Sequence, residues 1–114
     1  MEVINLKEKE EWEDIISDNS RNTELIIFKH SPICHINHSV ATALDDWSAS
    51  LDGKNDLRIL KVNVIDSKPL SEKISKDLNI WHQSPQIIWL DKNRNVKHHA
   101  SHFEITEEKL NKYL

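Results

Sequence analysis

The chain has 114 residues, of which 38% are apolar and 30% charged, and its formal net charge is -4. A chain of this length forms one domain, residues 1–114, around a single core. The acidic balance leaves no basic stripe, so nucleic acid is not an expected partner. No stretch of about 18 apolar residues could cross a membrane, and residues 1–8 lack the layout of a signal peptide. The composition therefore predicts a small cytoplasmic globular protein.

Apolar residues in the first half of the chain recur with the periods of two strands and two helices. The short apolar run of residues 3–6 predicts an edge strand, and residues 7–19 carry apolar side chains at helical spacing. The continuous apolar run of residues 25–28 is typical of a strand that is buried on both faces. A long helix with one buried face follows, and Asp52-Gly53 ends it. Its apolar positions recur in steps of four or three and are Ile36, Val40, Leu44, Trp47 and Leu51.

The second half of the chain contains a strand, a helix, a hairpin and a last helix. The strand covers residues 57–64, and the helix after it has Asp66 or Ser67 as its expected N-cap. A turn cluster at residues 91–95 joins the two strands of the hairpin. The remaining expected elements are the strands at 87–90 and 96–99, the third helix with Leu70, Ile74 and Leu78 on its apolar face, and a last helix from Thr106 with Leu110, Tyr113 and Leu114 on its apolar face.

The expected order of elements is therefore β-α-β-α-β-α-β-β-α. A strand-helix-strand crossover is almost always right-handed, so the first half forms a parallel βαβ unit and the second half ends in an antiparallel hairpin. Helices then cover both faces of one mixed sheet. This α/β arrangement resembles the thioredoxin-like fold, in which a redox cysteine lies between the second strand and the second helix.

Cys34 is the only cysteine of the chain, and it lies at that place. A single cysteine cannot form an internal disulfide, which fits a reducing compartment. The unpaired N–H groups and the positive dipole end of a helix N-terminus favour a thiolate over a thiol, so Cys34 is a candidate nucleophile. A half-buried structural cysteine is the alternative interpretation.

Two short segments resemble those of a known family. They are Phe28-Lys29-His30-Ser31, which leads to Cys34, and Ser84-Pro85-Gln86, which precedes residues 87–90. Both are similar to segments of the YtxJ-like monothiol bacilliredoxins of low-GC Gram-positive bacteria, within the thioredoxin-like superfamily. The resemblance implies that the Ser84-Pro85 bond is cis and that the proline faces the redox cysteine.

The resemblance also implies a function, a thiol-disulfide oxidoreductase that acts in the cytoplasm during oxidative stress. Such a protein binds no cofactor, uses the low-molecular-weight thiol bacillithiol as co-substrate, and acts on S-bacillithiolated proteins. The site itself differs from the family pattern. The family usually has Cys-Pro-Ile-Ser, whereas this chain has Cys34-His35-Ile36-Asn37, so His35 replaces the proline and Asn37 the serine.

Cys34 can be aligned with a redox motif in two ways. It can hold the first, attacking position, or Ser31-Pro32-Ile33-Cys34 can correspond to a glutaredoxin Cys-Pro-Tyr-Cys that has lost its attacking cysteine. In thioredoxins and glutaredoxins the attacking cysteine follows the last aromatic residue of the strand by five residues. Phe28 precedes Cys34 by six residues and Ser31 by three, which favours the first alignment and a sulfur that is at least partly exposed. Asn37 then stands where a resolving cysteine would be, which predicts a monothiol mechanism.

Several side chains near the thiol have two interpretations. His35 and His38 could exchange a proton with Cys34 or could be solvated helix residues. Cys34 and His38 lie one helical turn apart, as two metal ligands would, but no third ligand has a matching spacing, so no metal is expected. Lys29 and His30 could add positive charge near the thiol, and we expect both to be solvated.

We expect Cys34 to be the catalytic residue of a protein that reduces mixed disulfides between bacillithiol and proteins. The expected residues of the motif and the substrate groove are His35, Ile36, Asn37, Trp81, Ser84 and Pro85. Trp81 could instead belong to the core. The alternative function is that of a thioredoxin-fold binding or adaptor protein with a non-catalytic cysteine. The thiol separates the two functions, because a pKa well below about 8.5 favours exchange.

Overall fold

The structure, a computed structural model, describes residues 2–18, 23–32, 35–51 and 56–114. Five described strands form one sheet in the order β1-β3-β2-β4-β5. The strands are β1 (Glu2–Leu6), β2 (Glu24–His30), β3 (Leu57–Asn63), β4 (Gln86–Leu90) and β5 (Val96–Ser101). The helices are α1 (Lys9–Ser17), α2 (His35–Ser50), α3 (Lys68–Leu78) and α4 (Glu107–Asn111), with a 3-10 turn η1 (His102–Glu104) before α4.

The strand directions confirm the predicted topology. β1, β3 and β2 are parallel neighbours, which is the expected βαβ arrangement. β4 pairs with β2 antiparallel, and β5 pairs with β4 antiparallel, which is the expected hairpin. Because β4 runs against β2, the start of β4 lies beside the end of β2, and Gln86 is opposite Lys29.

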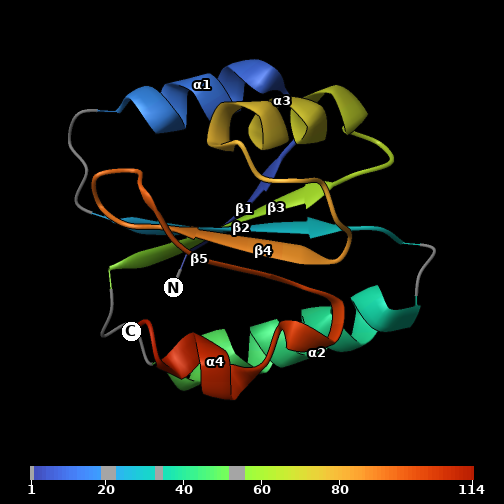
Figure 1. The fold of residues 1–114 in the computed structure, drawn as a ribbon, viewed down its shortest axis with the longest axis vertical. Helices are drawn as coiled ribbons and strands as arrows, with labels where there is room; N and C mark the ends of the chain where they lie inside the picture. Colours follow the sequence, from blue (N-terminus) through green and yellow to red (C-terminus); the bar gives the residue numbers. More distant parts are fainter. Residues whose placement is uncertain (1, 19–22, 33–34, 52–55) are drawn as a thin grey trace.

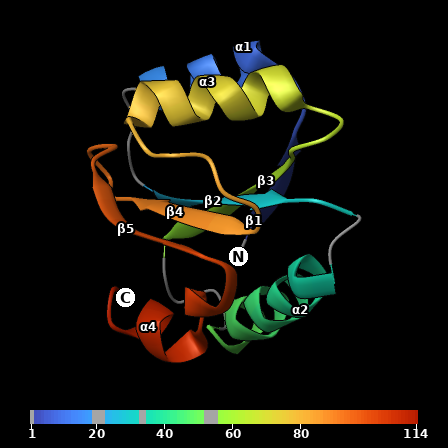
Figure 2. The same ribbon diagram turned by 45° about the vertical axis from the view of Figure 1, so that its right-hand side comes forward.

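Helices cover both faces of the sheet, with α1 and α3 on one face and α2 and α4 on the other (Figure 1, Figure 2). The two faces bury separate apolar clusters. The cluster under α2 and α4 includes Phe28 and Trp47, and the cluster under α1 and α3 includes Trp12 and Ile27. None of the described helices is long and apolar enough to cross a membrane.

β2 is buried on both faces, as its apolar run predicts. Ile27 belongs to the cluster on the α3 side, and Phe28 belongs to the cluster on the α2 side. Side chains along a strand point alternately to the two faces. The next two residues continue this alternation, so Lys29 lies on the face of α3 and His30 on the face of α2.

Three predicted details differ or lie outside the described chain. Ser67 is the N-cap residue of α3, but its side chain makes no capping hydrogen bond. Leu114, predicted on the apolar face of the last helix, is 51% exposed, because α4 already ends at Asn111. Gly53, the predicted end of the second helix, lies outside the described residues.

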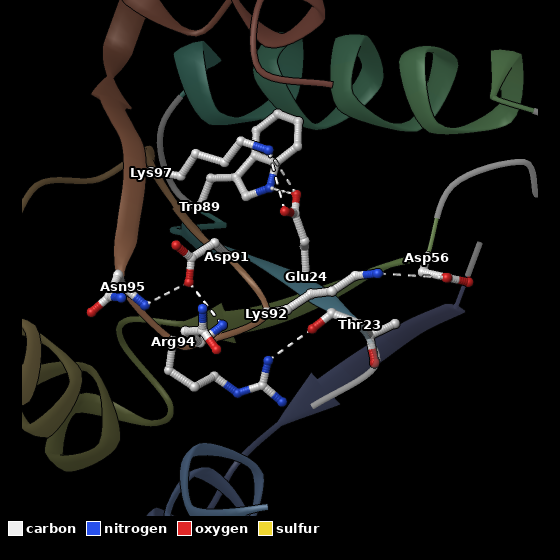
Figure 3. Close-up of polar contacts among 10 residues, drawn as sticks. Thr23, Glu24, Asp56, Trp89, Asp91, Lys92, Arg94, Asn95 and Lys97 are labelled. Carbon is white, nitrogen blue, oxygen red and sulfur yellow. Dashed lines mark hydrogen bonds and ion pairs between the residues drawn. The ribbon is translucent and has the colours of Figure 1, made fainter. Parts of the chain in front are cut away.

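An ion pair holds the start of β2 (Figure 3). Glu24 accepts hydrogen bonds from Lys97 Nζ at 2.9 and 3.2 Å and from Trp89 Nε1 at 3.0 Å. Lys97 Nζ also lies 5.0 Å from the centre of the Trp89 ring. Arg94 Nη1 donates to the carbonyl oxygen of Thr23 at 2.8 Å. These contacts join the β4–β5 hairpin to the beginning of β2.

Candidate active site at the end of β2

The segment between β2 and α2 contains the predicted nucleophile. β2 ends at His30 and α2 begins at His35. Cys34 lies outside the described residues, as do the side chains of His35, Ile36 and Asn37. The two alignments of Cys34 differ at residues outside the described set, so the alignment in which Cys34 holds the first position of the motif stays a prediction. The exposure of its sulfur stays a prediction.

The N-terminus of α2 follows Cys34 directly in the chain. α2 has 16 residues, which is long enough for the peptide dipoles to add up. The first turn of such a helix presents unpaired N–H groups and partial positive charge to the residue before it. A helix N-terminus in general favours a thiolate, the form of cysteine that attacks a disulfide, and the thiolate character of Cys34 stays a prediction.

Pro85 lies at the same end of the sheet. The Ser84-Pro85 bond is cis, as predicted. Pro85 is buried, Ser84 is half-buried, and β4 begins at the next residue, Gln86, which pairs with the end of β2. The carbonyl oxygen of Pro85 accepts a hydrogen bond from the N–H of His102 at 3.0 Å. The chain reversal before β4 therefore brings the predicted proline to the end of β2 from which the Cys34 segment leaves.

Trp81 lies on the surface of the loop that joins α3 to Pro85. Its side chain is 86% exposed, so the interpretation as a core residue is wrong. Its carbonyl oxygen accepts a hydrogen bond from Gln86 Nε2 at 2.9 Å. A groove of about 560 Å³ runs between this loop and α3, and it is lined by Glu72, Ser75, Lys76, Asn79, Ile80, Trp81 and His82. Trp81 thus lines a groove. Because Cys34 lies outside the described residues, the prediction that this groove lies beside Cys34 stays a prediction.

Lys29 is wholly buried, so the expectation of a solvated side chain is wrong. Its Nζ donates to the carbonyl oxygen of Ser71 at 2.9 Å and to Ser75 Oγ at 2.6 Å, both in α3. It also lies 3.4 Å from Nδ1 of His82, in the loop before Pro85. Burial, which disfavours the charged form, lowers the pKa of Lys29 to about 8.

His30 lies on the opposite face and is half-buried. Burial first, and then the positive charge of Lys61, lower the pKa of His30. Both effects favour the uncharged form of the His30 imidazole. A cavity of about 210 Å³ separates it from the first turns of α2, and that cavity is lined by Phe28, His30, Ser31, Pro32, His38, Ala41 and Lys61.

His38 had two interpretations, a solvated helix residue or a partner of Cys34 in proton exchange or metal binding. His38 is exposed on α2, as the interpretation of a solvated helix residue requires. Among the residues that the structure describes, no three His, Cys, Asp or Glu side chains come together in a way that could hold a metal ion. The pair of Cys34 and His38 lies partly outside that set.

Sequence reasoning missed the roles of Lys29 and His82 in this region. The available signal was the alternation along β2, since Lys29 is two residues after Ile27 on the same face. The general rule that lysine stays at the surface concealed that signal. His82 carries no pattern in the sequence, because its contact with Lys29 depends on the path of the loop.

Comparisons with known proteins agree with this geometry. The chain matches the family model of the monothiol bacilliredoxin BrxC over residues 4–110. A solved protein described as having a thioredoxin fold superposes with a TM-score of 0.82 at 22% identity, over 97% of this chain and 92% of that one. Thioredoxin from Schistosoma mansoni gives a TM-score of 0.72 at 18% identity, over all of both chains. Thioredoxin from Fasciola hepatica gives a TM-score of 0.68 at 15% identity, over 98% of this chain and 94% of that one.

The solved structures show that the fold is that of thioredoxin, as the order of elements predicts. The fold alone does not identify the family. The family match does, because it covers residues 4–110 of the 114-residue chain. The protein therefore belongs to the monothiol bacilliredoxin family and has a thiol-disulfide redox function.

Proposed function

We propose that Cys34 is the nucleophile that removes bacillithiol from mixed disulfides with proteins. The observation that carries this proposal is the place of the only cysteine. Cys34 stands in the sequence between β2 and α2, Pro85 precedes the neighbouring strand β4, and the chain matches the monothiol bacilliredoxins. A single cysteine, which can form no internal disulfide, fits a reducing compartment and supports a cytoplasmic location and a role in recovery from oxidative stress.

The proposed exchange has two steps. The Cys34 thiolate attacks the bacillithiol sulfur of the mixed disulfide, the protein cysteine leaves as a thiolate, and a disulfide between Cys34 and bacillithiol forms. A second, external thiolate then attacks the bacillithiol sulfur of this adduct, and Cys34 leaves as a thiolate. The two electrons that reduce the protein cysteine thus come from the external thiol. The chain has no second cysteine, so the external thiol is required.

Two described residues support this chemistry. His30 is half-buried, lines the cavity next to α2 and stands four residues before Cys34 in the sequence, which suits an acceptor of the thiol proton. Trp81 offers a large exposed apolar surface on the loop before Pro85, which suits contact with the protein part of the substrate. Their proposed roles are proton acceptor and docking residue, respectively.

Intact-mass spectrometry tests the proposal. The reduced protein is mixed with an S-bacillithiolated protein, and a single bacillithiol adduct on Cys34 is expected, together with release of the reduced partner. The Cys34→Ser variant should acquire no adduct. A parent protein that acquires no adduct, and whose thiol reacts slowly with iodoacetamide, would instead support the binding or adaptor function.

A further inference from the structure

Lys29 occupies a position where the fold favours an apolar side chain. Ile27, two residues earlier on the same face of β2, packs in the cluster under α1 and α3, and Lys29 itself is 0% exposed. Among the described residues, the groups that its Nζ contacts are a backbone carbonyl, a hydroxyl and an imidazole, with no carboxylate. A buried ammonium without a carboxylate among these partners destabilises the fold compared with an apolar side chain of similar size.

The contacts of Lys29 connect three elements. Lys29 itself is in β2, Ser71 and Ser75 are in α3, and His82 is in the loop before Pro85. An ammonium group has three N–H donors, and these three acceptors use all of them. Because an ammonium can only donate, Nδ1 of His82 must be unprotonated in this contact.

Gln86, the first residue of β4 and the register partner of Lys29, also holds this loop. Gln86 Nε2 donates to the carbonyl oxygen of Trp81 at 2.9 Å, and Gln86 Oε1 accepts from the N–H of Gln83 at 3.4 Å. Lys29 therefore contacts the side chain of His82, while Gln86 holds the backbone at positions 81 and 83. The Trp81 ring, although 86% exposed, is carried by a backbone that is anchored at neighbouring residues.

We propose that Lys29 is a positioning residue whose ammonium holds His82 and thereby presents Trp81 to the protein part of the mixed disulfide. This proposal rests on the proposed exchange function and deepens it. A small disulfide has no protein surface for Trp81 to contact. The loss of the Lys29 ammonium should therefore slow the reaction of protein substrates and leave small substrates unaffected.

The anchoring contact depends on two protonation states. Lys29 must be protonated, and burial lowers its pKa to about 8. His82 must be unprotonated at Nδ1, and partial burial and the charge of Lys29 lower its pKa, whereas Glu72 of α3 acts in the opposite direction. The neighbours of Lys29 on β3 and β4, Val62 and Gln86, are uncharged. The contact is therefore present between the two pKa values and weakens on both sides of that interval.

Two variants remove the contact from its two sides. Lys29→Met closely matches the length and volume of the side chain without the ammonium, and His82→Ala removes the acceptor from an exposed residue. Lys92→Met, at the other end of the sheet, is the matched control. Hydrogen exchange of the amides of residues 80–84 and the rates with an S-bacillithiolated protein and with bacillithiol disulfide are measured at pH 7.

In both variants, amide exchange in the loop should be at least about tenfold faster than in the parent. The protein substrate should react about tenfold more slowly, whereas the rate with bacillithiol disulfide should stay within about twofold of the parent rate. Unchanged loop exchange and unchanged rates would overturn the proposal. Equal slowing of both substrates would also overturn it, because Lys29 would then act on the thiol and not on the loop. A parent that reacts with neither disulfide would overturn the proposed function, whereas the loop exchange would still decide whether Lys29 anchors His82.

Discussion

The two ends of β2 hold charged side chains in opposite ways. Glu24, the first residue of the strand, meets Lys97 at 2.9 Å and Trp89 Nε1 at 3.0 Å, and the side chains of the ion pair keep 22% and 28% of their exposure. Lys29, near the end of the strand, is fully buried and meets uncharged acceptors. One charge is paired and partly solvated, whereas the other is desolvated.

This difference separates a contribution to stability from a contribution to function. The ion pair of Glu24 and Lys97 joins the hairpin to β2, and its contribution to stability is sufficient to explain its presence. The Lys29 ammonium opposes stability and lies at the end of the strand that leads to Cys34. A buried charge with no carboxylate among its described partners is a reason to look for a function, and the anchoring of the Trp81 loop is the one that we propose.

The largest expected effect concerns the end of β2 that carries the chemistry. Cys34→Ser should reduce the exchange of bacillithiol mixed disulfides to the uncatalysed rate, because the chain has no other thiol. The free energy of unfolding should change by less than about 0.5 kcal/mol, since we expect the sulfur to pack against little. Exchange kinetics and urea unfolding of the same preparation check both parts. Residual activity above the uncatalysed rate would contradict the assignment of the nucleophile.

The second prediction concerns the pH dependence of stability. The pKa of Lys29 is about 8 in the folded protein and 10.5 when unperturbed, so between these values the unfolded chain binds the proton more strongly. The stability of the parent should therefore rise, relative to that of Lys29→Met, as the pH increases from 8 to 10.5. The lowered pKa corresponds to a loss of at most about 3 kcal/mol in the free energy of unfolding. This loss is complete below pH 8 and disappears above pH 10.5.

Urea unfolding of the parent and of Lys29→Met at pH 7 and pH 10 measures that difference. The variant should be the more stable of the two at pH 7, and its advantage should shrink at pH 10. A difference between the two proteins that is the same at both pH values would show that Lys29 keeps its ordinary pKa.

The third prediction tests the other end of β2. Glu24→Gln removes the carboxylate that Lys97 contacts, and it should destabilise the protein by about 2 kcal/mol, because a charge-assisted and partly buried contact is lost. Asp56→Asn is the matched control, since the pair of Asp56 and Lys92 is exposed and 4.0 Å apart and should contribute less than about 0.5 kcal/mol. Thermal unfolding measures both. Equal effects of the two substitutions would remove the contrast between paired and exposed charges.

The fourth prediction concerns the docking surface. Trp81→Ala should lower kcat/KM for a protein mixed disulfide about tenfold, equivalent to about 1.4 kcal/mol, through loss of apolar contact. Phe103→Ala removes another exposed aromatic ring, 80% exposed in η1, and should leave the rate within about twofold. Steady-state kinetics of both variants provide the comparison. A similar loss in both would point to general hydrophobic attraction and not to a docking residue.

The smallest expected effect concerns the first residue of α2. His35→Pro restores the residue that the family motif usually has, and proline is tolerated in the first turn of a helix. The fold should survive, while the thiol loses a possible N–H donor and a possible proton partner. The midpoint of iodoacetamide alkylation against pH should move upward by a fraction of a unit. Superimposable curves for parent and variant would mean that His35 is a solvated bystander.

The fold could be predicted from the sequence because its signals are local and repeated. The continuous run that contains Ile27 and Phe28 identifies a strand buried on both faces, and the spacing of Val40, Leu44 and Trp47 identifies α2. η1 was not predicted, because a 3-10 turn of three residues has no period to detect. The exposure of Leu114 was missed for a related reason, since the helix has only five residues and ends at Asn111, three positions before Leu114.

The site could be predicted only in part. The place of Cys34 before a helix and the cis bond at Pro85 follow from the order of elements and from the family resemblance. The burial of Lys29 and its contact with His82 could not be predicted, because they depend on side chains 53 positions apart in the sequence. Trp81 was left open for the same reason, since a tryptophan in a loop gives no periodic signal.

One paired measurement tests most directly whether the two ends of β2 serve different purposes. Lys29→Met and Lys97→Met are the same substitution at the two ends, and each protein is assayed at pH 7 for urea unfolding and for reduction of an S-bacillithiolated protein. Lys29→Met should be at least as stable as the parent and about tenfold slower, whereas Lys97→Met should lose about 1–2 kcal/mol and keep its rate. If Lys29→Met were instead destabilised like Lys97→Met while reacting at the rate of the parent, Lys29 would be a structural residue and the distinction between the two ends would be wrong.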